Sequence, residues 1–220
     1  MSISELSQNI VNDILRLIQQ NSGKVGRYRS FSLEYTDPLY FDLTANIKIT
    51  SDLYPNRDLY FKDTPSEILR FEKFGFAVDG NSFSGNSEDS AEIDINIAVD
   101  PTQIGSQKLK AKLLDVIRHE VEHILQKGPN ASPDHKVKIP RAATRSAAQT
   151  NYKYFILSDE IPAQVRGLAE EALESNISVR EAAIEYLTPF LELGFITQAQ
   201  IEKVLAIWKN WSNQHNIKFD

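Results

Sequence analysis

The chain has 220 residues, of which 41% are hydrophobic and 25% charged, as in an ordinary globular protein. Its net charge of −6 and its pI of about 5.3 argue against a general nucleic-acid binder, which usually carries a basic face. It has no cysteine, so disulfides and thiolate ligands are excluded, and any metal must be held by histidine, aspartate or glutamate.

The first segment predicts an amphipathic helix rather than a targeting sequence. Apolar residues recur at helical spacing from Ile10 to Ile18, and residues 21–23 (Asn-Ser-Gly) end the pattern. A signal peptide would need a basic start and an uninterrupted apolar core. A membrane span would need about 18 consecutive apolar residues, which occur nowhere in the sequence. We therefore expect a soluble protein, cytoplasmic or virion-associated, with no membrane partner.

From residue 25 to residue 100 the pattern changes to that of half-buried strands. Residues 40–50 and 91–100 alternate apolar and polar side chains, so each is predicted to form a strand with one buried face. Residues 71–80 are a weaker strand candidate. Residues 81–90, rich in serine, asparagine and glycine, are predicted to form a loop between strands.

Helices follow the strands. A long helix is predicted from Ser106, a suitable N-cap, to a stop at Gly128 and Pro129. Residues 129–157 have no clear period and are predicted to form a long loop, which inside a domain is often functional. A second helix is predicted with Ser158 as its N-cap. Two more open with capping boxes, Ser178 with Glu181 and Thr197 with Gln200.

The histidines carry the strongest chemical signal. His119 and His123, two of the four in the chain, lie four residues apart on the long predicted helix, with Glu120 directly after the first. Side chains at this spacing share a helix face, with Cβ atoms about 5–6 Å apart, so two imidazoles can bind one zinc ion. Glu120 is rotated by about 100° and can reach water on the metal as a general base. The alternative interpretation is an exposed helix face with two idle histidines.

Two histidines do not complete a catalytic zinc site, which usually has three protein ligands. Glu160, in the first turn of the next predicted helix, is the leading candidate for the third, and Gln164 would then steady a ligand. Asp159, Glu170 and His135 are alternatives, although the spacing to His135 does not match the three-histidine metzincin motif. A carboxylate at a helix N-terminus is also favoured by the helix dipole alone.

Residues 91–175 resemble the gluzincin type of zinc metallopeptidase. In that family a helix bears His-Glu-x-x-His and a later helix supplies a glutamate; the matching residues here are His119, Glu120, His123 and Glu160. Gln164 departs from the family pattern, which has aspartate four residues after the ligand. The segment also resembles phage-encoded metallopeptidases that are themselves uncharacterised. The resemblance implies a zincin-like fold, Zn²⁺ as cofactor, a peptide or protein substrate, and residues 91–100 as the strand lining the substrate cleft.

Other side chains are candidates for stabilising the oxyanion that forms during amide hydrolysis. Tyr154, together with Tyr152, precedes the second predicted helix, and Arg166 lies six residues beyond Glu160. A tyrosine in such a run is otherwise a half-buried strand residue, and an arginine on a helix is otherwise solvated.

The sequence therefore predicts an α+β fold with a mixed or antiparallel sheet, an active-site helix and a helical C-terminal part. Residues 1–128 and 129–220 are the two candidate domains, or they form a single one. The predicted function is that of a zinc-dependent metallohydrolase, a peptidase with Glu120 as general base. The alternatives are a non-catalytic metal-binding protein, structural or virion-associated, and a metal-dependent toxin or regulator with one narrow substrate. No nucleic-acid partner is expected.

Overall fold

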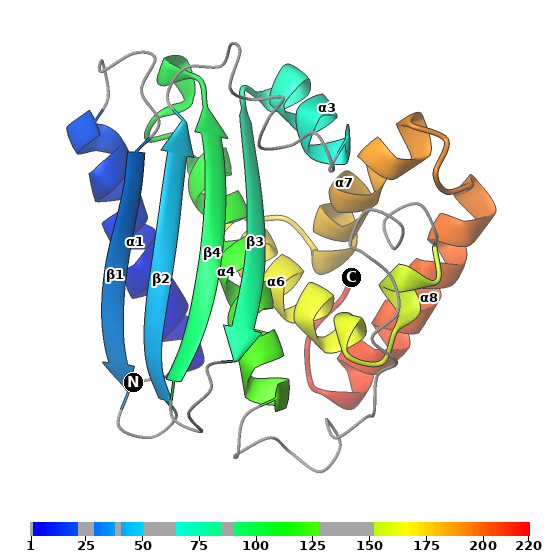
Figure 1. Ribbon diagram of the computed structural model, residues 1–220. Helices are drawn as coiled ribbons and strands as arrows, with labels where there is room; N and C mark the ends of the chain where they lie inside the picture. Colours follow the sequence, from blue (N-terminus) through cyan, green and yellow to red (C-terminus); the bar gives the residue numbers. More distant parts are fainter. Residues whose placement is uncertain (1, 22–28, 38–40, 51–64, 85–89, 128–151) are drawn as a thin grey trace.

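The structure, a computed structural model, describes residues 2–21, 29–37, 41–50, 65–84, 90–127 and 152–220. In chain order they form α1 (Ile3–Asn21), β1 (Arg29–Asp37), β2 (Phe41–Thr50), α3 (Pro65–Phe74), β3 (Phe76–Ser84), β4 (Ser90–Val99), a 3-10 turn (Pro101–Gln103), α4 (Gln107–Lys127), a second 3-10 turn (Tyr154–Ile156), α6 (Glu160–Ser175), α7 (Val179–Glu192) and α8 (Gln198–Gln214). The predicted α+β class is confirmed, with a helical C-terminal part beside the sheet (Figure 1).

The four strands form one mixed sheet in the order β1-β2-β4-β3. The pairs β1–β2 and β3–β4 are antiparallel, whereas β2 and β4 run parallel. Strand β4 therefore lies inside the sheet, and β3 forms the edge nearest the C-terminal helices (Figure 1).

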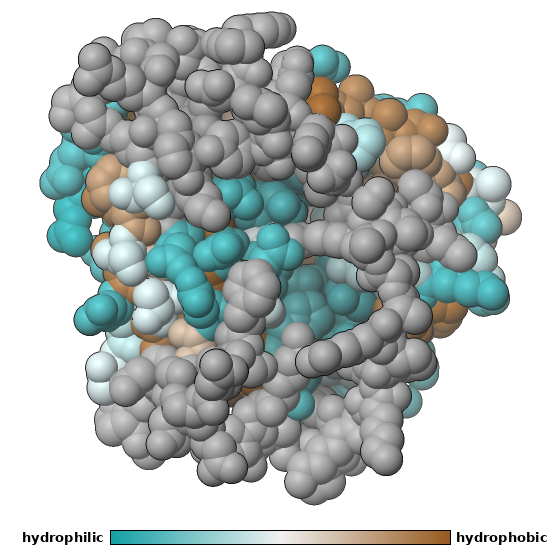
Figure 2. All heavy atoms as spheres, in the orientation of Figure 1, coloured by the Kyte–Doolittle hydropathy of each residue, from teal (hydrophilic) through white to brown (hydrophobic). Residues whose placement is uncertain are grey.

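Helices α1 and α4 cover one face of the sheet (Figure 1). The alternation along β4 explains this, because Ile93, Ile95 and Ile97 are at most 1% exposed and belong to the same buried core as Ile14 of α1 and Ile117 of α4. Each fully buried isoleucine contributes about 1.5–3 kcal/mol through removal of apolar surface from water. The opposite face carries polar side chains, which gather over the middle of the sheet (Figure 2).

The segment around β3 differs from the sequence prediction. Residues 71–74 end helix α3, and Gly75, at φ 74°, turns the chain directly into β3. Only glycine adopts this backbone conformation without strain. Strand β3 then continues through residues 81–84, which were predicted to be loop, because they pair with the start of β4. Residues 85–89 of that predicted loop lie outside the described residues, and Ser90 begins β4.

The predicted helix boundaries are largely confirmed. Ser106 caps α4, its Oγ accepting a hydrogen bond from the backbone N–H of Leu109 at 3.2 Å. Both predicted capping boxes are present, at the starts of α7 and α8. Helix α6 begins one residue later than predicted, with Asp159 rather than Ser158 at the N-cap position and no capping hydrogen bond from its side chain. The predicted stop after α4 and most of the predicted long loop lie outside the described residues.

Helix α6 packs antiparallel along α4 and joins the sheet to the C-terminal helices (Figure 1). A Cβ at Gly167 would lie 2.6 Å from the carbonyl oxygen of Asp115, so glycine is what allows the two backbones to approach here. Two turns earlier on the same face of α6 stands Glu160. Helices α6, α7 and α8 form a second core around Trp208, which is fully buried. No helix of the described residues is long and apolar enough to cross a membrane.

Candidate metal centre

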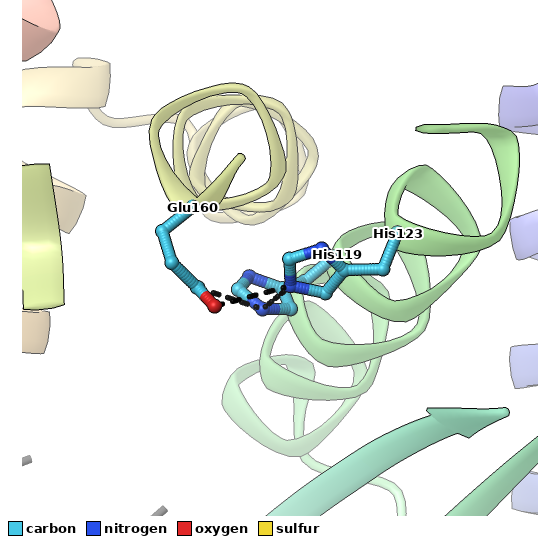
Figure 3. A group of neighbouring side chains, drawn as sticks. All are labelled: His119, His123 and Glu160. Carbon is cyan, nitrogen blue, oxygen red and sulfur yellow. Dashed lines mark hydrogen bonds and ion pairs between the residues drawn. The ribbon is translucent and has the colours of Figure 1, made fainter. Parts of the chain in front are cut away.

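His119 and His123 on α4 and Glu160 on α6 point toward one another (Figure 3). The two Nε2 atoms are 3.0 Å apart. Nε2 of His119 lies 3.6 Å from Oε2 of Glu160, and Nε2 of His123 lies 3.6 Å from Oε1. Each of the three residues is 8% exposed. The helical spacing of the histidines and the antiparallel packing of α6 thus bring three potential donors together.

The donor set fits a divalent cation. Zinc bound by nitrogen and oxygen at about 2.0–2.2 Å in a tetrahedron requires donor atoms about 3.3 Å apart, and the observed separations lie on either side of that value. His119, His123 and Glu160 are the one group of three or more such side chains within the described residues that could hold a metal ion. Two neutral imidazoles and a carboxylate are ligands that zinc commonly accepts.

Gln126 fixes the orientation of one histidine. Its Nε2 donates a hydrogen bond to the carbonyl oxygen of Asp159 at 2.8 Å, which leaves its Oε1 facing Nδ1 of His123 at 3.2 Å. Because an amide oxygen only accepts, Nδ1 of His123 carries a hydrogen, and Nε2 is the ring nitrogen that a cation would bind in place of a proton. Gln126 thereby connects a ligand on α4 to the residue that precedes Glu160.

The charges of the three side chains are complementary. Burial lowers the pKa of His123, but the Glu160 carboxylate, with smaller effects of Glu120 and Gln126, outweighs it and raises that pKa to about 9. Burial likewise raises the pKa of Glu160, but the two histidines and a hydrogen bond from Tyr154 lower it to about 2. In the metal-free protein a proton on His123 therefore balances the carboxylate.

Glu120 lies beside the three donors. It is 4% exposed and lines, with His119, Tyr154, Gln164 and Tyr186, a hollow of about 50 Å³ that we call the metal-side cleft. Strand β3 forms one wall, and its Gly80 fits directly against Glu120, since a Cβ at Gly80 would lie 2.7 Å from Cγ of Glu120.

The prediction of which strand lines the cleft was wrong. The resemblance implied residues 91–100, but β4 is interior, and it is Val78, Asp79 and Gly80 of β3 that line the metal-side cleft. The cause is the strand order, because the chain inserts β4 between β2 and β3. Alternation within one strand does not reveal its place in the sheet.

The predicted oxyanion donors lie in different places. Tyr154 lines the metal-side cleft and hydrogen-bonds Glu160. The hydroxyl of Tyr152 is instead 3.4 Å from Nζ of Lys203. Nε of Arg166 lies 3.2 Å from Oε1 of Glu122, and its guanidinium stacks 5.6 Å from the ring centroid of Trp211, outside the lining of the cleft.

None of the alternative third ligands that the structure describes joins His119 and His123. Asp159 is absent from the three-residue group, and its backbone carbonyl accepts a hydrogen bond from Gln126. Glu170 lies near the buried guanidinium of Arg118. His135 lies outside the described residues. Gln164, expected to steady a ligand, donates from Nε2 to the hydroxyl of Tyr186 at 3.0 Å.

Two residues of the centre were not found from the sequence. Tyr186 comes from α7 and carries no local motif, so nothing in the sequence placed it at the cleft. Burial raises the pKa of Tyr186 far above its usual range, so its hydroxyl stays protonated and able to donate. Gln126 follows His123 by three residues. Side chains at this spacing are neighbours on a helix, so the sequence could have indicated Gln126 as a partner of His123.

No family model matches this chain, and no curated protein and no solved structure is similar to it at a significant level. The fold and the geometry of the centre are therefore what bears on function. The likeness to gluzincins and to phage metallopeptidases stays at the level of the motif.

Proposed function

We propose that this protein is a zinc-dependent metallohydrolase that cleaves peptide bonds, with His119, His123 and Glu160 as metal ligands. The observation that carries the proposal is the buried convergence of the three side chains from two helices, with Glu120 beside them. Three protein ligands leave one tetrahedral position for water or substrate, as in catalytic rather than structural zinc sites. When bound, zinc supplies Lewis-acid chemistry, lowering the pKa of water and polarising a carbonyl group.

Glu120 acts as the general base. It accepts a proton from the attacking water as the new C–O bond forms, then passes that proton to the leaving amine as the C–N bond breaks. Its side chain is packed against Gly80 and buried, so its carboxylate is held on the cleft side of α4. This placement supports the role, because a base must stand within hydrogen-bond reach of the proton it removes.

Tyr154 and Tyr186, the two tyrosines that line the metal-side cleft, have different roles. Tyr154 hydrogen-bonds Glu160 and so positions that ligand. Tyr186 accepts a hydrogen bond from Gln164, which leaves its own O–H proton for the oxyanion of the tetrahedral intermediate. Preorganised donors of this kind are worth about 10²–10³ in kcat in other hydrolases.

The peptide substrate is favoured by the position of β3. It is an edge strand of the described sheet, and its Asp79 and Gly80 line the metal-side cleft. An extended peptide can add to such an edge through main-chain hydrogen bonds, which would place a scissile bond along the cleft.

A non-catalytic metal site is the second candidate, favoured by the burial of all three ligands at 8% exposure each. A structural site would bind zinc tightly without an exchangeable water. The two candidates differ in what Glu120 does, because a structural site has no use for a base.

The test is the Glu120→Gln variant, which keeps the size of the side chain and removes its basicity. We expect it to bind one zinc per chain, by elemental analysis, and to lose at least about 10³-fold in kcat on a peptide library that the unaltered protein digests. Glu192→Gln, at an exposed ion pair, is the matched control and should retain full activity. Unchanged turnover in Glu120→Gln, or absence of hydrolysis by the zinc-loaded native chain on every peptide, would overturn the proposal.

A further inference from the structure

A second, larger hollow adjoins the metal-side cleft. It has a volume of about 330 Å³, in the range of small-ligand pockets, and lies between α3, β3, α4, α6 and α7. We call it the side pocket. Glu67, Val78 and Tyr186 line both hollows, so the two share a wall next to the centre.

The side pocket has an apolar wall and an ionisable end. The apolar wall is formed by Phe74, Phe76, Ala77, Val78 and Ile177. The ionisable groups come from every helix around it: Glu67 and Arg70 on α3, Lys108 and Lys112 on α4, Glu171 on α6, and Glu185 with Tyr186 on α7. A ligand that fills it therefore needs both a hydrocarbon part and a charged end.

Most of the cations are already paired. Arg70 lies 3.3 Å from Glu67, and Nζ of Lys112 lies 2.5 Å from Asp115. Lys108 is exposed, and its Nζ stands 5.3 Å from the ring centroid of Phe74.

The carboxylates exceed the remaining cations. Glu171 and Glu185 have no ion-pair partner among the described residues. Glu67 is 7% exposed, and its Oε2 has no hydrogen-bond partner, although it lies where the two hollows meet. A buried acceptor left without a donor destabilises the protein, and a ligand with N–H groups would satisfy it. With Arg70 and Lys112 already paired, the carboxylates of Glu171 and Glu185 share the side pocket with one remaining cation, Lys108.

We propose that the side pocket is a specificity subsite that takes a lysine or arginine side chain of the substrate. Its methylene stem lies along the apolar wall of α3 and β3, and its cationic end pairs with Glu171 and Glu185. Long basic side chains bury their stems on apolar surface in this way while keeping the charged end paired. This inference rests on the proposed peptidase function and deepens it by naming the substrate class.

The state of Glu171 supports the charge assignment. Burial and the negative charge of Asp115 raise its pKa to about 7, against the weaker opposing effects of Lys112 and Arg70. A raised pKa means that the surrounding positive charge does not fully compensate the ionised carboxylate. A bound ammonium or guanidinium group would supply the missing positive charge.

The first test measures binding rather than cleavage. Otherwise identical peptides carry lysine, arginine, norleucine or glutamate at each position in turn, and their affinity for the zinc-loaded Glu120→Gln protein is read by fluorescence anisotropy. At one position we expect lysine and arginine to bind at least about tenfold more tightly than norleucine. Adding Glu171→Gln should reduce that preference below about threefold, whereas Glu174→Gln, on the same helix and outside the pocket, should leave it unchanged.

The variant is expected to fold, because glutamine matches the shape of a protonated glutamate. Glu185→Gln, at the exposed rim, provides a second test and should also weaken the preference. Equal affinity for lysine and norleucine at all positions, or a preference that survives both variants, overturns the inference.

A small probe separates this inference from the proposed function. The zinc-loaded native chain is titrated with n-butylammonium, and the methyl signals of Ile177 are followed by NMR; n-butanol is the uncharged control. If peptides are cleaved without basic preference and n-butylammonium does not shift these signals, the subsite is refuted and the peptidase stands. If no peptide is cleaved but n-butylammonium shifts them in a Glu171-dependent way, the peptidase is refuted and the cation-binding pocket stands.

Discussion

Nδ1 of His123 lies 3.2 Å from Oε1 of Gln126, and that contact leaves the other ring nitrogen of His123 directed at His119 and Glu160. The same glutamine holds the backbone of Asp159, at the start of α6. One side chain therefore contacts both a proposed ligand, at the ring nitrogen that determines its tautomer, and the start of the helix that carries the proposed third ligand.

Gln126→Ala should weaken zinc binding by about 10–100-fold, as the loss of a partner behind a metal-bound histidine usually does. Zinc affinity would be measured by competition with a chelator of known strength. Gln126→Glu, which keeps an acceptor for Nδ1 of His123, is the comparison and should bind more tightly than the alanine variant. Equal zinc affinity in all three proteins would show that Gln126 does not support the ligand.

Zinc binding should release a proton. The metal-free pKa of His123 is about 9, so below that pH the cation must displace the proton shared with Glu160, whose pKa of about 2 keeps it ionised. We expect apparent zinc affinity to rise by up to about tenfold per pH unit between pH 6.5 and 9, and to level off above pH 9. Calorimetry in two buffers of different ionisation enthalpy measures the proton directly, and an absence of release at pH 7 would contradict the expected protonation.

Glu171→Gln should stabilise the protein at high pH. The folded-state pKa of Glu171 is raised from 4.5 to about 7, so the folded state binds the proton more tightly than the unfolded chain does. The stability due to that proton is complete below pH 4.5 and is lost as the pH rises through 7. The glutamine variant does not lose it, so its unfolding free energy should exceed that of the native chain by roughly 1 to 3 kcal/mol at pH 8. Urea denaturation at pH 5 and pH 8 checks this, and a difference that does not grow with pH would refute it.

Gly80→Ala should impair catalysis without removing zinc. Its Cβ would meet Cγ of Glu120 and Cγ1 of Val116 at 2.7 Å each, so the general base or strand β3 must move. We expect kcat to fall at least about tenfold, since small displacements of a catalytic group are costly. Ser82→Ala on the same strand adds no atoms and is the control. Full activity in Gly80→Ala would mean that the position of Glu120 is not critical.

Tyr186→Phe tests the proposed oxyanion donor. Removing the hydroxyl should lower kcat by about 10²-fold with little change in KM, because the donor acts in the transition state. Tyr152→Phe, whose hydroxyl faces Lys203 away from the centre, should behave like the native chain. A rise in KM alone would indicate that Tyr186 binds substrate rather than stabilising the intermediate.

The sequence predicted the elements whose residues carry their own signal. The alternation in residues 91–100 and the caps at Ser106, Ser178 and Thr197 are local, so they identified β4 and three helices correctly. The spacing of His119 and His123 likewise depends only on helix geometry. The convergence of the two histidines with Glu160 also depends on how α6 packs on α4. The helix dipole explains a carboxylate at the start of α6 but says nothing about that packing.

What escaped prediction depends on contacts between distant segments. The end of α3 at Phe74 and the extension of β3 to Ser84 follow from Gly75 and from pairing with β4, neither of which shows in the periodicity. Tyr186 reaches the cleft because α7 folds back over α6. The side pocket is assembled from five elements, so no single stretch of sequence could indicate it.

If the three side chains bind a metal ion as proposed, their division between α4 and α6 would give that ion a role in assembly. A chain emerging from the ribosome presents both histidines well before Glu160, so high-affinity capture must wait until the later helix has docked. Once captured, the ion stabilises that docked arrangement by mass action, and its release would be coupled to separation of the two helices. Cellular zinc supply would then govern how long the protein survives proteolysis, as well as how fast it turns over substrate.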